Sequence, residues 1–247
     1  MKRFSALVFA FLFLALAPFA QAKTYVNGID ANYPPFSFID EQGNAAGFDI
    51  ESMNWIANKM GFEVQHTPIN WDGIIPALQA EKIDMICSGM SISEERKQAV
   101  NFSEPYYSIK KYIAVKNGSN LTAEEVFKGK YTLGVQRGTN EHELLQSRID
   151  NEKLAITLRL YDSPPMSVED LLNGRIDAVA IDSAPAEDAI KNGKAIKIVG
   201  EYAPGDDFGV AVNKENAELL KLINDGYELL KKDPFWQELH TKYLSNH

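Results

Sequence analysis

The feature of this chain that most constrains its fold is a repeating order of apolar strand, turn and amphipathic helix. In the first block, strands are predicted at residues 25–29, 63–67 and 83–87, with helices at residues 50–60 and 71–79. Strands that alternate with helices form a sheet whose faces the helices cover. The pattern therefore predicts an α/β fold with mainly parallel sheets.

A second block repeats this order, which makes the chain long enough for two lobes. Its predicted strands lie at residues 112–115, 131–135 and 178–181, and its helices follow Thr139, Val168 and Ala184. The remaining strand at 208–212 and helices at 216–231 and 235–243 are too short for a third lobe. We predict two crossings between the lobes, with lobe 1 at residues 23–108 plus 209–247, lobe 2 at residues 112–204, and hinge segments at about 108–111 and 201–208.

The first 22 residues have the pattern of a secretory signal peptide. Lys2 and Arg3 precede an almost entirely apolar run at residues 4–19, and Ala20-Gln21-Ala22 forms a peptidase cleavage pattern. The apolar run is shorter than the roughly 20 residues that a transmembrane helix needs. Because no cysteine lies at the cleavage point to carry a lipid, we expect a freely soluble protein in the periplasm.

Charge and cysteine content narrow the classes of partner. Without its first 22 residues the chain has 23 basic and 34 acidic side chains, a net formal charge of −11. Such an acidic chain is poorly suited to bind nucleic acid or an anionic membrane surface. The single cysteine, Cys87, cannot form an internal disulfide and ends an apolar strand, so we expect a buried and unreactive thiol.

Residues 87–96 combine the elements of a carboxylate-binding site. A predicted strand ends there in small residues, and Ser93 is a suitable N-cap followed by two glutamates. Free backbone N–H groups between the strand and the helix can bind an anion. Arg96 can add a planar, bidentate guanidinium at the same place. An ordinary strand–turn–helix junction with a surface arginine has the same local pattern, so spacing alone leaves both interpretations open.

Six short motifs occur in order along residues 23–243: IDANYPPF at 29–36, GFDI at 47–50, WDGIIPAL at 71–78, GMSISEER at 89–96, FSEPYY at 102–107 and GRIDA at 174–178. Together they resemble the polar amino-acid branch of the periplasmic solute-binding proteins. The resemblance implies a two-lobed, type II α/β fold that closes on an amino acid. It also implies a partner, an ABC importer in the inner membrane that receives the ligand.

The resemblance assigns the ligand's head group to residues of both lobes. Arg96 matches the arginine that clamps the α-carboxylate, helped by the Ser91 hydroxyl and by main-chain atoms around Ser88 and Gly89. Asp182 matches the aspartate of the second lobe that binds the α-ammonium. Its position at the end of a strand also suits a helix N-cap, and the two roles do not exclude each other.

The ligand's side chain is assigned to three residues of the first lobe. Tyr33 and Trp71 match an aromatic pair that holds the side chain by van der Waals contact and, for a cationic ligand, by cation–π attraction. Asp30 matches an acidic position that faces the side-chain end of the ligand in members that bind basic amino acids or glutamine. The alternative for Asp30 is a turn-capping carboxylate.

A second-lobe loop at Thr139 and Asn140 matches the segment that contacts the ligand carboxylate through backbone N–H groups at a helix start. Two residues depart from the family pattern. Asn140 replaces a threonine or glycine, and Arg137 follows Gln136 where an uncharged residue is more common. If Arg137 points into the cleft, an acidic or amide ligand is favoured, but strand alternation places Gln136 and Arg137 on opposite sides.

We therefore predict a monomeric, extracytoplasmic binding protein that captures a polar, preferably basic, amino acid and delivers it to an inner-membrane ABC permease, with only peripheral docking at the membrane. Glutamine or another polar amino acid is the alternative ligand, and a sensor module or a cyclohexadienyl dehydratase-like enzyme is the alternative function. The four histidines have no metal-ligand spacing and no nucleotide-binding motif occurs, so no catalytic residue, metal or cofactor is expected. The predicted ligand-binding residues are Asp30, Tyr33, Trp71, Ser88, Gly89, Met90, Ser91, Arg96, Thr139, Asn140 and Asp182.

Overall fold

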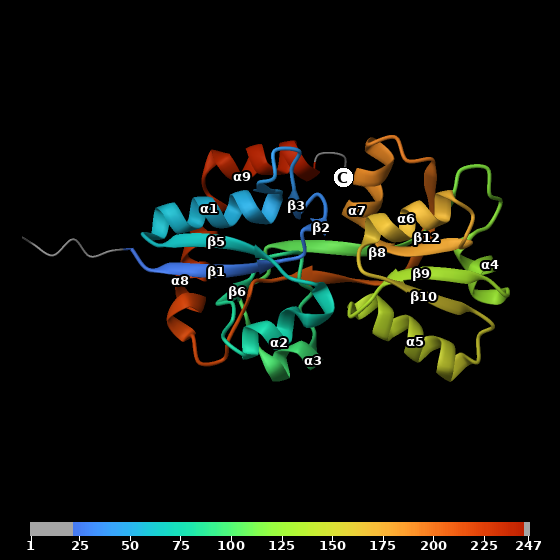
Figure 1. Ribbon diagram of the computed structural model, residues 1–247, viewed down its shortest axis with the longest axis horizontal. Helices are drawn as coiled ribbons and strands as arrows, with labels where there is room; N and C mark the ends of the chain where they lie inside the picture. The colour runs from blue at the N-terminus through green and yellow to red at the C-terminus, as the bar shows by residue number, and fades with distance from the viewer. Residues whose placement is uncertain (1–21, 245–247) are drawn as a thin grey trace, which may run out of the picture.

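The computed structural model describes residues 22–244, which form two lobes, each built on its own five-stranded sheet (Figure 1). The sheet of lobe 1 has the strand order β5-β1-β6-β13-β7, and the sheet of lobe 2 has the order β10-β9-β11-β8-β12. This two-lobed α/β architecture confirms the predicted fold class. Of the predicted signal peptide, only its last residue lies within the described part of the chain.

The longest strands, β8 and β12, are those in which the chain passes between the lobes. A small third sheet, β2-β3-β4, carries part of the IDANYPPF motif. The strands are β1 (Thr24–Ile29), β2 (Asn32–Tyr33), β3 (Ser37–Ile39), β4 (Ala45–Ala46), β5 (Glu63–Pro68), β6 (Met85–Ile86), β7 (Asn101–Phe102), β8 (Tyr107–Lys116), β9 (Thr132–Gln136), β10 (Thr157–Tyr161), β11 (Ala178–Asp182), β12 (Ile196–Phe208) and β13 (Ala211–Val212).

Both large sheets are mixed, which corrects the expectation of mainly parallel sheets. In lobe 1, β1 pairs in parallel with β5 and β6, whereas β13 is antiparallel to β6 and β7. In lobe 2, β9 pairs in parallel with β10 and β11, whereas β8 is antiparallel to β11 and β12. The antiparallel strands include those that carry the chain from one lobe to the other, so the two crossings account for the difference.

The helices cover both faces of each sheet. They are α1 (Phe48–Met60), α2 (Ile74–Gln79), α3 (Glu94–Ala99), α4 (Ala123–Lys128), α5 (Asn140–Glu152), α6 (Pro164–Leu172), α7 (Ser183–Lys191), α8 (Ala217–Leu230) and α9 (Pro234–Leu239), with a 3₁₀ turn η1 (Trp71–Gly73) before α2 and a π-helical turn η2 (His240–Leu244) after α9. Within residues 22–244, no helix is long and apolar enough to cross a membrane.

In lobe 1, α1, α8 and α9 pack on one face of the sheet and α2 packs on the other. The helices α1 and α8 approach closely because Gly226 has no side chain, and a Cβ at this position would lie 2.4 Å from Ile56 Cγ2. On the other face of the sheet, Ile74 and Leu78 of α2 pack in one apolar cluster with the buried Ile86. The C-terminal helices therefore complete the core of lobe 1, as expected from the shortness of the last segment.

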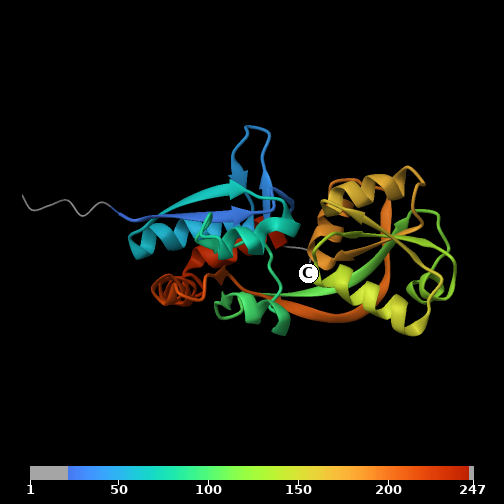
Figure 2. The same ribbon diagram turned by 60° about the horizontal axis from the view of Figure 1, so that its bottom comes forward.

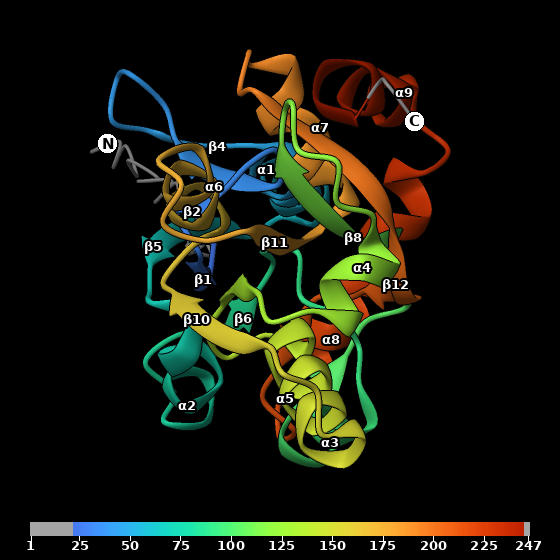
Figure 3. The same cartoon turned by 90° about the vertical axis from the view of Figure 1, so that its right-hand side faces the viewer.

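Lobe 2 has the same three layers, which are visible from its end in Figure 3. Alternate residues of β8 serve the two faces of the sheet, as the pleat of a strand requires. Ile113 and Val115 pack in the cluster that includes residues of α4 and α5, and Ala114 packs in the cluster that includes residues of α6 and α7. Both faces of this sheet are thus buried.

Two long antiparallel strands join the lobes (Figure 2). The pairing of β8 with β12 runs from Tyr107↔Phe208 at lobe 1 to Lys116↔Ile196 in lobe 2, and Phe208 also bridges to Ser91. The register shifts three times along this ladder. The predicted hinge segments fall within these two strands, and the exact division of the chain into lobes at those residues stays a prediction.

Candidate functional site

A small cavity lies between the two lobes, where the ends of several strands meet. Its volume is about 10 Å³, which is room for about one water molecule. Any larger ligand therefore requires the lobes to separate or side chains to move. The cavity is lined from lobe 1 by Asp30, Tyr33, Trp71, Ser88, Gly89, Ser91 and Arg96, and from lobe 2 by Gln136, Thr139, Glu141 and Asp182.

Arg96 extends from the first turn of α3 into this cavity. The N-cap predicted at Ser93 is confirmed, because its hydroxyl accepts a hydrogen bond from the Arg96 backbone N–H at 3.2 Å. The Arg96 guanidinium is buried, and its hydrogen-bond acceptors among residues 22–244 are neutral carbonyls, Ser91 O at 3.0 Å and, across the lobes, Gly138 O at 3.4 Å. Burial lowers the pKa of Arg96. An arginine remains charged nonetheless, so its positive charge is available to an anionic group of a ligand.

The Trp71 indole packs beside the Arg96 side chain and also reaches lobe 2. Its ring centroid lies 5.6 Å from Arg96 Cζ, and its Nε1–H donates to Gly138 O at 3.1 Å. The guanidinium is therefore held between a ring and carbonyl oxygens in a fixed orientation. A planar group fixed in this way is well suited to pair with a carboxylate.

Asp182 enters the cavity from lobe 2, at the end of β11. It occupies the N-cap position of α7, but its side chain makes no capping hydrogen bond. Instead Oδ2 accepts a hydrogen bond of 2.5 Å from the Tyr33 hydroxyl of lobe 1, and Oδ1 is buried without a partner among residues 22–244. Burial, and next the charge of Glu141, raises the pKa of Asp182 well above its usual range. Such a carboxylate is stabilised by an added cation.

Asp30 caps its turn, as one of the two interpretations predicts, and it also lines the cavity, while its contact with a ligand side chain stays a prediction. Its Oδ1 caps the following turn by accepting from the Asn32 backbone N–H at 2.9 Å, while its Oδ2 accepts from Gln136 Nε2 at 2.7 Å across the lobes. Burial raises the pKa of Asp30. The neighbouring Arg137 points away from the cavity, as strand alternation predicts. Its half-exposed guanidinium lies 3.8 Å from Asp162 Oδ1.

Lys111 and Glu141 are two charged residues at the site that sequence reasoning missed. Glu141 lines the cavity from the first turn of α5, and its carboxylate forms an ion pair with the buried Lys111 on β8. The Lys111 ammonium also lies 2.6 Å from Asp206 Oδ2. Burial disfavours this ammonium, but the charges of Glu141 and Asp182 hold the pKa of Lys111 above its usual range. An acidic residue in a first helical turn usually complements the helix dipole, so the sequence had no signal for this contact.

The other predicted residues are distributed between the cavity wall and the structure behind it. Thr139 caps α5, with its hydroxyl accepting from the His142 N–H and donating to Gln136 O. Met90 packs in the apolar cluster of lobe 1, and the Asn140 amide donates to Asp206 at 3.3 Å. The structure therefore places nine of the eleven predicted residues in the cavity wall, and Met90 and Asn140 outside it.

One expectation for the loop after β6 needs correction. Its backbone N–H groups were expected to be free for an anion, but the Gly89 N–H donates to the Asp49 carboxylate at 2.6 Å. The Ser88 hydroxyl accepts from the Asp30 N–H at 2.9 Å and lies 2.7 Å from the Ser37 hydroxyl. These groups fix the shape of the loop, and the Gly89 N–H is not available to an anion in this arrangement.

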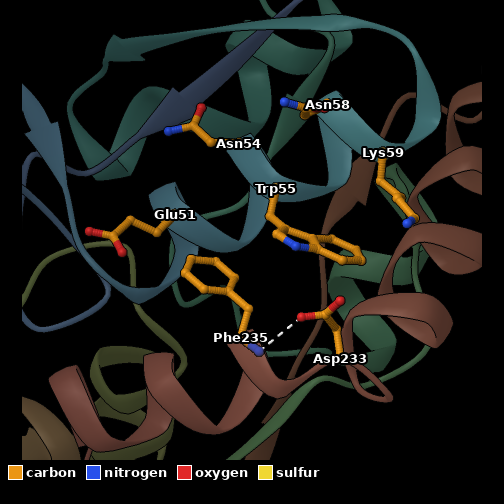
Figure 4. Close-up of a pocket in the computed structure, with 7 residues that line it drawn as sticks. All are labelled: Glu51, Asn54, Trp55, Asn58, Lys59, Asp233 and Phe235. Atoms are coloured by element: carbon orange, nitrogen blue, oxygen red, sulfur yellow. Dashed lines mark hydrogen bonds between the residues drawn. The ribbon is translucent and has the colours of Figure 1, made fainter.

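A larger hollow of about 440 Å³ lies on lobe 1 between α1 and the start of α9 (Figure 4). Its two carboxylates have partners within lobe 1. Glu51 accepts from Lys242 and Tyr243, each at 2.6 Å, and Asp233 accepts from the Phe235 N–H at 2.9 Å. Within residues 22–244, no group of three or more His, Cys, Asp or Glu side chains could hold a metal ion. The groups from both lobes that converge on the inter-lobe cavity make it the better candidate site.

Comparison with known proteins places this geometry in a family. A sequence profile of the bacterial extracellular solute-binding proteins, family 3, matches residues 25–246. The chain belongs to this family. It is 34% identical over 224 residues to the L-cystine-binding protein TcyJ of Escherichia coli strain K12, covering 90% of this chain and 82% of that protein.

Solved structures of other solute-binding proteins have the same fold. An ancestral arginine-binding protein, solved with arginine and with glutamine, is 38% identical and superposes with a TM-score of 0.83; the match covers 90% and 92% of this chain, and 98% and 100% of those chains. An ancestral amino acid-binding protein described as a precursor of cyclohexadienyl dehydratase is 33% identical, with a TM-score of 0.82, covering 90% of this chain and 96% of that one. The family 3 assignment thus extends over both lobes.

Proposed function

We propose that this protein captures a polar, preferably basic, amino acid outside the cytoplasm and delivers it to an inner-membrane ABC permease. The observation that carries the proposal is the pair of opposite charges that the two lobes bring to one cavity. Among residues 22–244, Arg96 of lobe 1 hydrogen-bonds to neutral carbonyls and to no carboxylate, and Asp182 of lobe 2 has a buried Oδ1 without a partner. The α-carboxylate and α-ammonium of an amino acid complement these two groups.

The charge balance of the cavity favours a cationic side chain. The lining residues include the carboxylates of Asp30, Glu141 and Asp182 but one guanidinium, that of Arg96. The Lys111 ammonium is shared by Glu141 and Asp206, so negative charge remains in excess around the cavity. The head group of an amino acid adds no net charge, whereas a basic side chain would balance the excess. A buried charge without a partner is costly, so this balance contributes to selectivity.

Glutamine is the second candidate ligand, and one contact favours it. The Gln136 amide already donates to Asp30 Oδ2 at 2.7 Å, so this carboxylate accepts an amide N–H₂ group. The ancestral arginine-binding protein was solved with arginine and with glutamine, which is consistent with one type of site for both side chains. Tyr33 and Trp71 would contact the ligand's side chain in either case.

The remaining parts of the proposal concern location and partners. We propose that residues 1–22 are removed during export, that the mature protein is a periplasmic monomer, and that it meets the membrane only by docking to its permease. A sensor module would use the same site with a different receptor. A dehydratase would need a proton donor or acceptor in the cavity, and turnover of a prephenate-like acid would support that alternative.

A thermal-shift screen of the twenty amino acids, ornithine and cystine tests the proposal directly. A ligand at 100 times its Kd stabilises the native state by about 2.7 kcal/mol, which is roughly 5–10 °C for a chain of this size. We expect arginine, lysine, ornithine or histidine to give the largest shift. Agmatine, which is arginine without its carboxylate, is the matched control and should give little shift. If no amino acid stabilises the protein, the proposal is wrong.

A further inference from the structure

The loop that carries the lobe 1 head-group contacts, residues 87–91, is held in place by buried polar side chains behind it. The Asn27 side-chain amide makes two hydrogen bonds to the Cys87 backbone. It accepts from the Cys87 N–H at 2.7 Å and donates to the Cys87 carbonyl at 3.2 Å. Two residues further on, the Gly89 N–H donates a hydrogen bond to Asp49 Oδ2 at 2.6 Å. The backbone of this loop is therefore fixed from behind, before it reaches the cavity.

Gly89 is the point at which this loop turns. Its φ is +60°, in the left-handed region that favours glycine, and a Cβ there would lie 2.4 Å from Tyr33 Cε1. The peptide is thus pressed between the Tyr33 ring on the cavity side and the Asp49 carboxylate on the other. A change in its orientation would move Ser88 and Ser91, which line the cavity, and the Ser91 carbonyl that orients Arg96.

Asp49 is a carboxylate in an apolar environment. It lies in the first turn of α1 with no exposed surface, and its Oδ2 accepts a second hydrogen bond, from the Tyr106 hydroxyl at 2.8 Å. Its Oδ1 is buried without a hydrogen-bond partner among residues 22–244. The titratable groups that face it from other elements are Tyr33, Cys87, Tyr106 and Tyr227, and none of these four carries positive charge.

A carboxylate in such a place is unfavourable for stability, and burial raises the pKa of Asp49 to about 7. Apolar packing alone would favour a neutral side chain here. The group that the carboxylate serves is the Gly89 N–H, because a charge-assisted hydrogen bond to a backbone N–H is about twice as strong as a neutral one.

We propose that Asp49 is a positioning residue of the ligand site: its carboxylate holds the left-handed Gly89 peptide and thereby sets the geometry of residues 88–91 and Arg96 around the ligand carboxylate. The inference rests on the proposed amino-acid binding function. Asp49 touches no ligand itself, so its effect is the same for every amino acid that binds through its head group. In this respect it differs from Asp30, which faces the side chain.

Calorimetry on a matched set of variants tests this role, using the amino acid with the largest thermal shift. Asp49→Ala removes the acceptor, and we expect affinity to fall about tenfold or more, as for loss of a hydrogen bond to a charged group. Asp49→Asn keeps an acceptor but loses the charge, so its affinity should lie between those of the wild type and Asp49→Ala. Ser52→Ala, a buried change in the same helix at a hydroxyl that makes no hydrogen bond within residues 22–244, should not alter affinity. Wild-type affinity in Asp49→Ala overturns the proposal.

An NMR measurement on the wild-type protein decides the question even if Asp49→Ala does not fold. The Gly89 amide resonance should titrate with a midpoint near 7, because it reports the charge of its acceptor. Saturating ligand should lower this midpoint, since coupling between ligand binding and Asp49 ionisation is reciprocal. A midpoint that saturating ligand does not lower refutes the role of Asp49. A wild-type protein that binds no amino acid instead refutes the proposed function.

Discussion

Replacing Asp49 with asparagine should stabilise the protein, and by an amount that depends on pH. The substitution keeps an acceptor for the Gly89 and Tyr106 donors, while it removes an ionisable group from an apolar environment. Burial raises the pKa of Asp49 from 3.8 to about 7 in the folded protein. A difference of this size corresponds to about 4 kcal/mol between the two protonation states.

The direction of this pH dependence follows from the protons that Asp49 binds in the folded and unfolded states. Between about pH 4 and pH 7, folded Asp49 keeps a proton that unfolded Asp49 has released, so the free energy of unfolding falls as the pH rises. Below about pH 4, Asp49 makes its full contribution to the free energy of unfolding. Above about pH 7 this contribution has been lost, and the free energy no longer changes with pH because of Asp49. Asp49→Asn lacks this dependence. Its advantage over the wild type should therefore grow between pH 4 and pH 8, to a limit of about 4 kcal/mol.

Urea unfolding of the ligand-free wild type and Asp49→Asn at four pH values between 4 and 8.5 measures this difference. With a denaturant slope of about 2–3 kcal/mol/M, the gap between the unfolding midpoints should widen by roughly 1.5 M. Ser52→Ala, on the same helix and without a titratable group, should stay parallel to the wild type at every pH. A constant gap between wild type and Asp49→Asn would show that Asp49 does not titrate in this range.

Three further predictions concern ligand binding. Arg96→Ala and Asp182→Ala should each weaken binding by about 2–5 kcal/mol in calorimetry, because each leaves a buried ligand charge without its partner; near wild-type affinity in both would contradict the head-group assignment. Asp30→Asn should weaken a cationic ligand much more than glutamine, since the lost contact is charge-assisted, and equal losses in competition binding would limit Asp30 to capping its turn. Small-angle scattering should give a smaller radius of gyration with saturating ligand than without, because the binding groups are split between the lobes; an unchanged radius would indicate a rigid site.

Local rules were sufficient where a residue's role depends on its near neighbours in sequence. Ser93 was predicted as an N-cap from the residues that follow it, and it caps α3. The opposite directions of Gln136 and Arg137 follow from the alternation of a strand. The architecture was predictable for a similar reason, because the order of apolar strands and amphipathic helices recurs in both lobes.

The missed features depend on contacts between distant segments. The segment of β12 around Pro204 and Gly205 has the composition of a loop, and the strand continues through it because Ala203 and Asp206 on either side pair with β8. Lys111 and Glu141 are ordinary surface residues in sequence, and the fold buries them together beside the cavity. Met90 shares a motif with Gly89 and Ser91, but in the structure its side chain packs in the apolar cluster of lobe 1.

The strand β13 has a consequence for the order in which the chain can fold. It lies between β6 and β7 in the sheet of lobe 1, and it is made from residues that follow the whole of lobe 2 in sequence. During synthesis, lobe 2 can complete its sheet once β12 has emerged, whereas the sheet of lobe 1 stays interrupted until β13 arrives. In a chain truncated before residue 211, we expect lobe 2 to resist proteolysis and lobe 1 to be digested. If the protein is exported as we propose, lobe 1 stays unfinished until late in synthesis, and a chain that has not yet been translocated benefits from being unfolded.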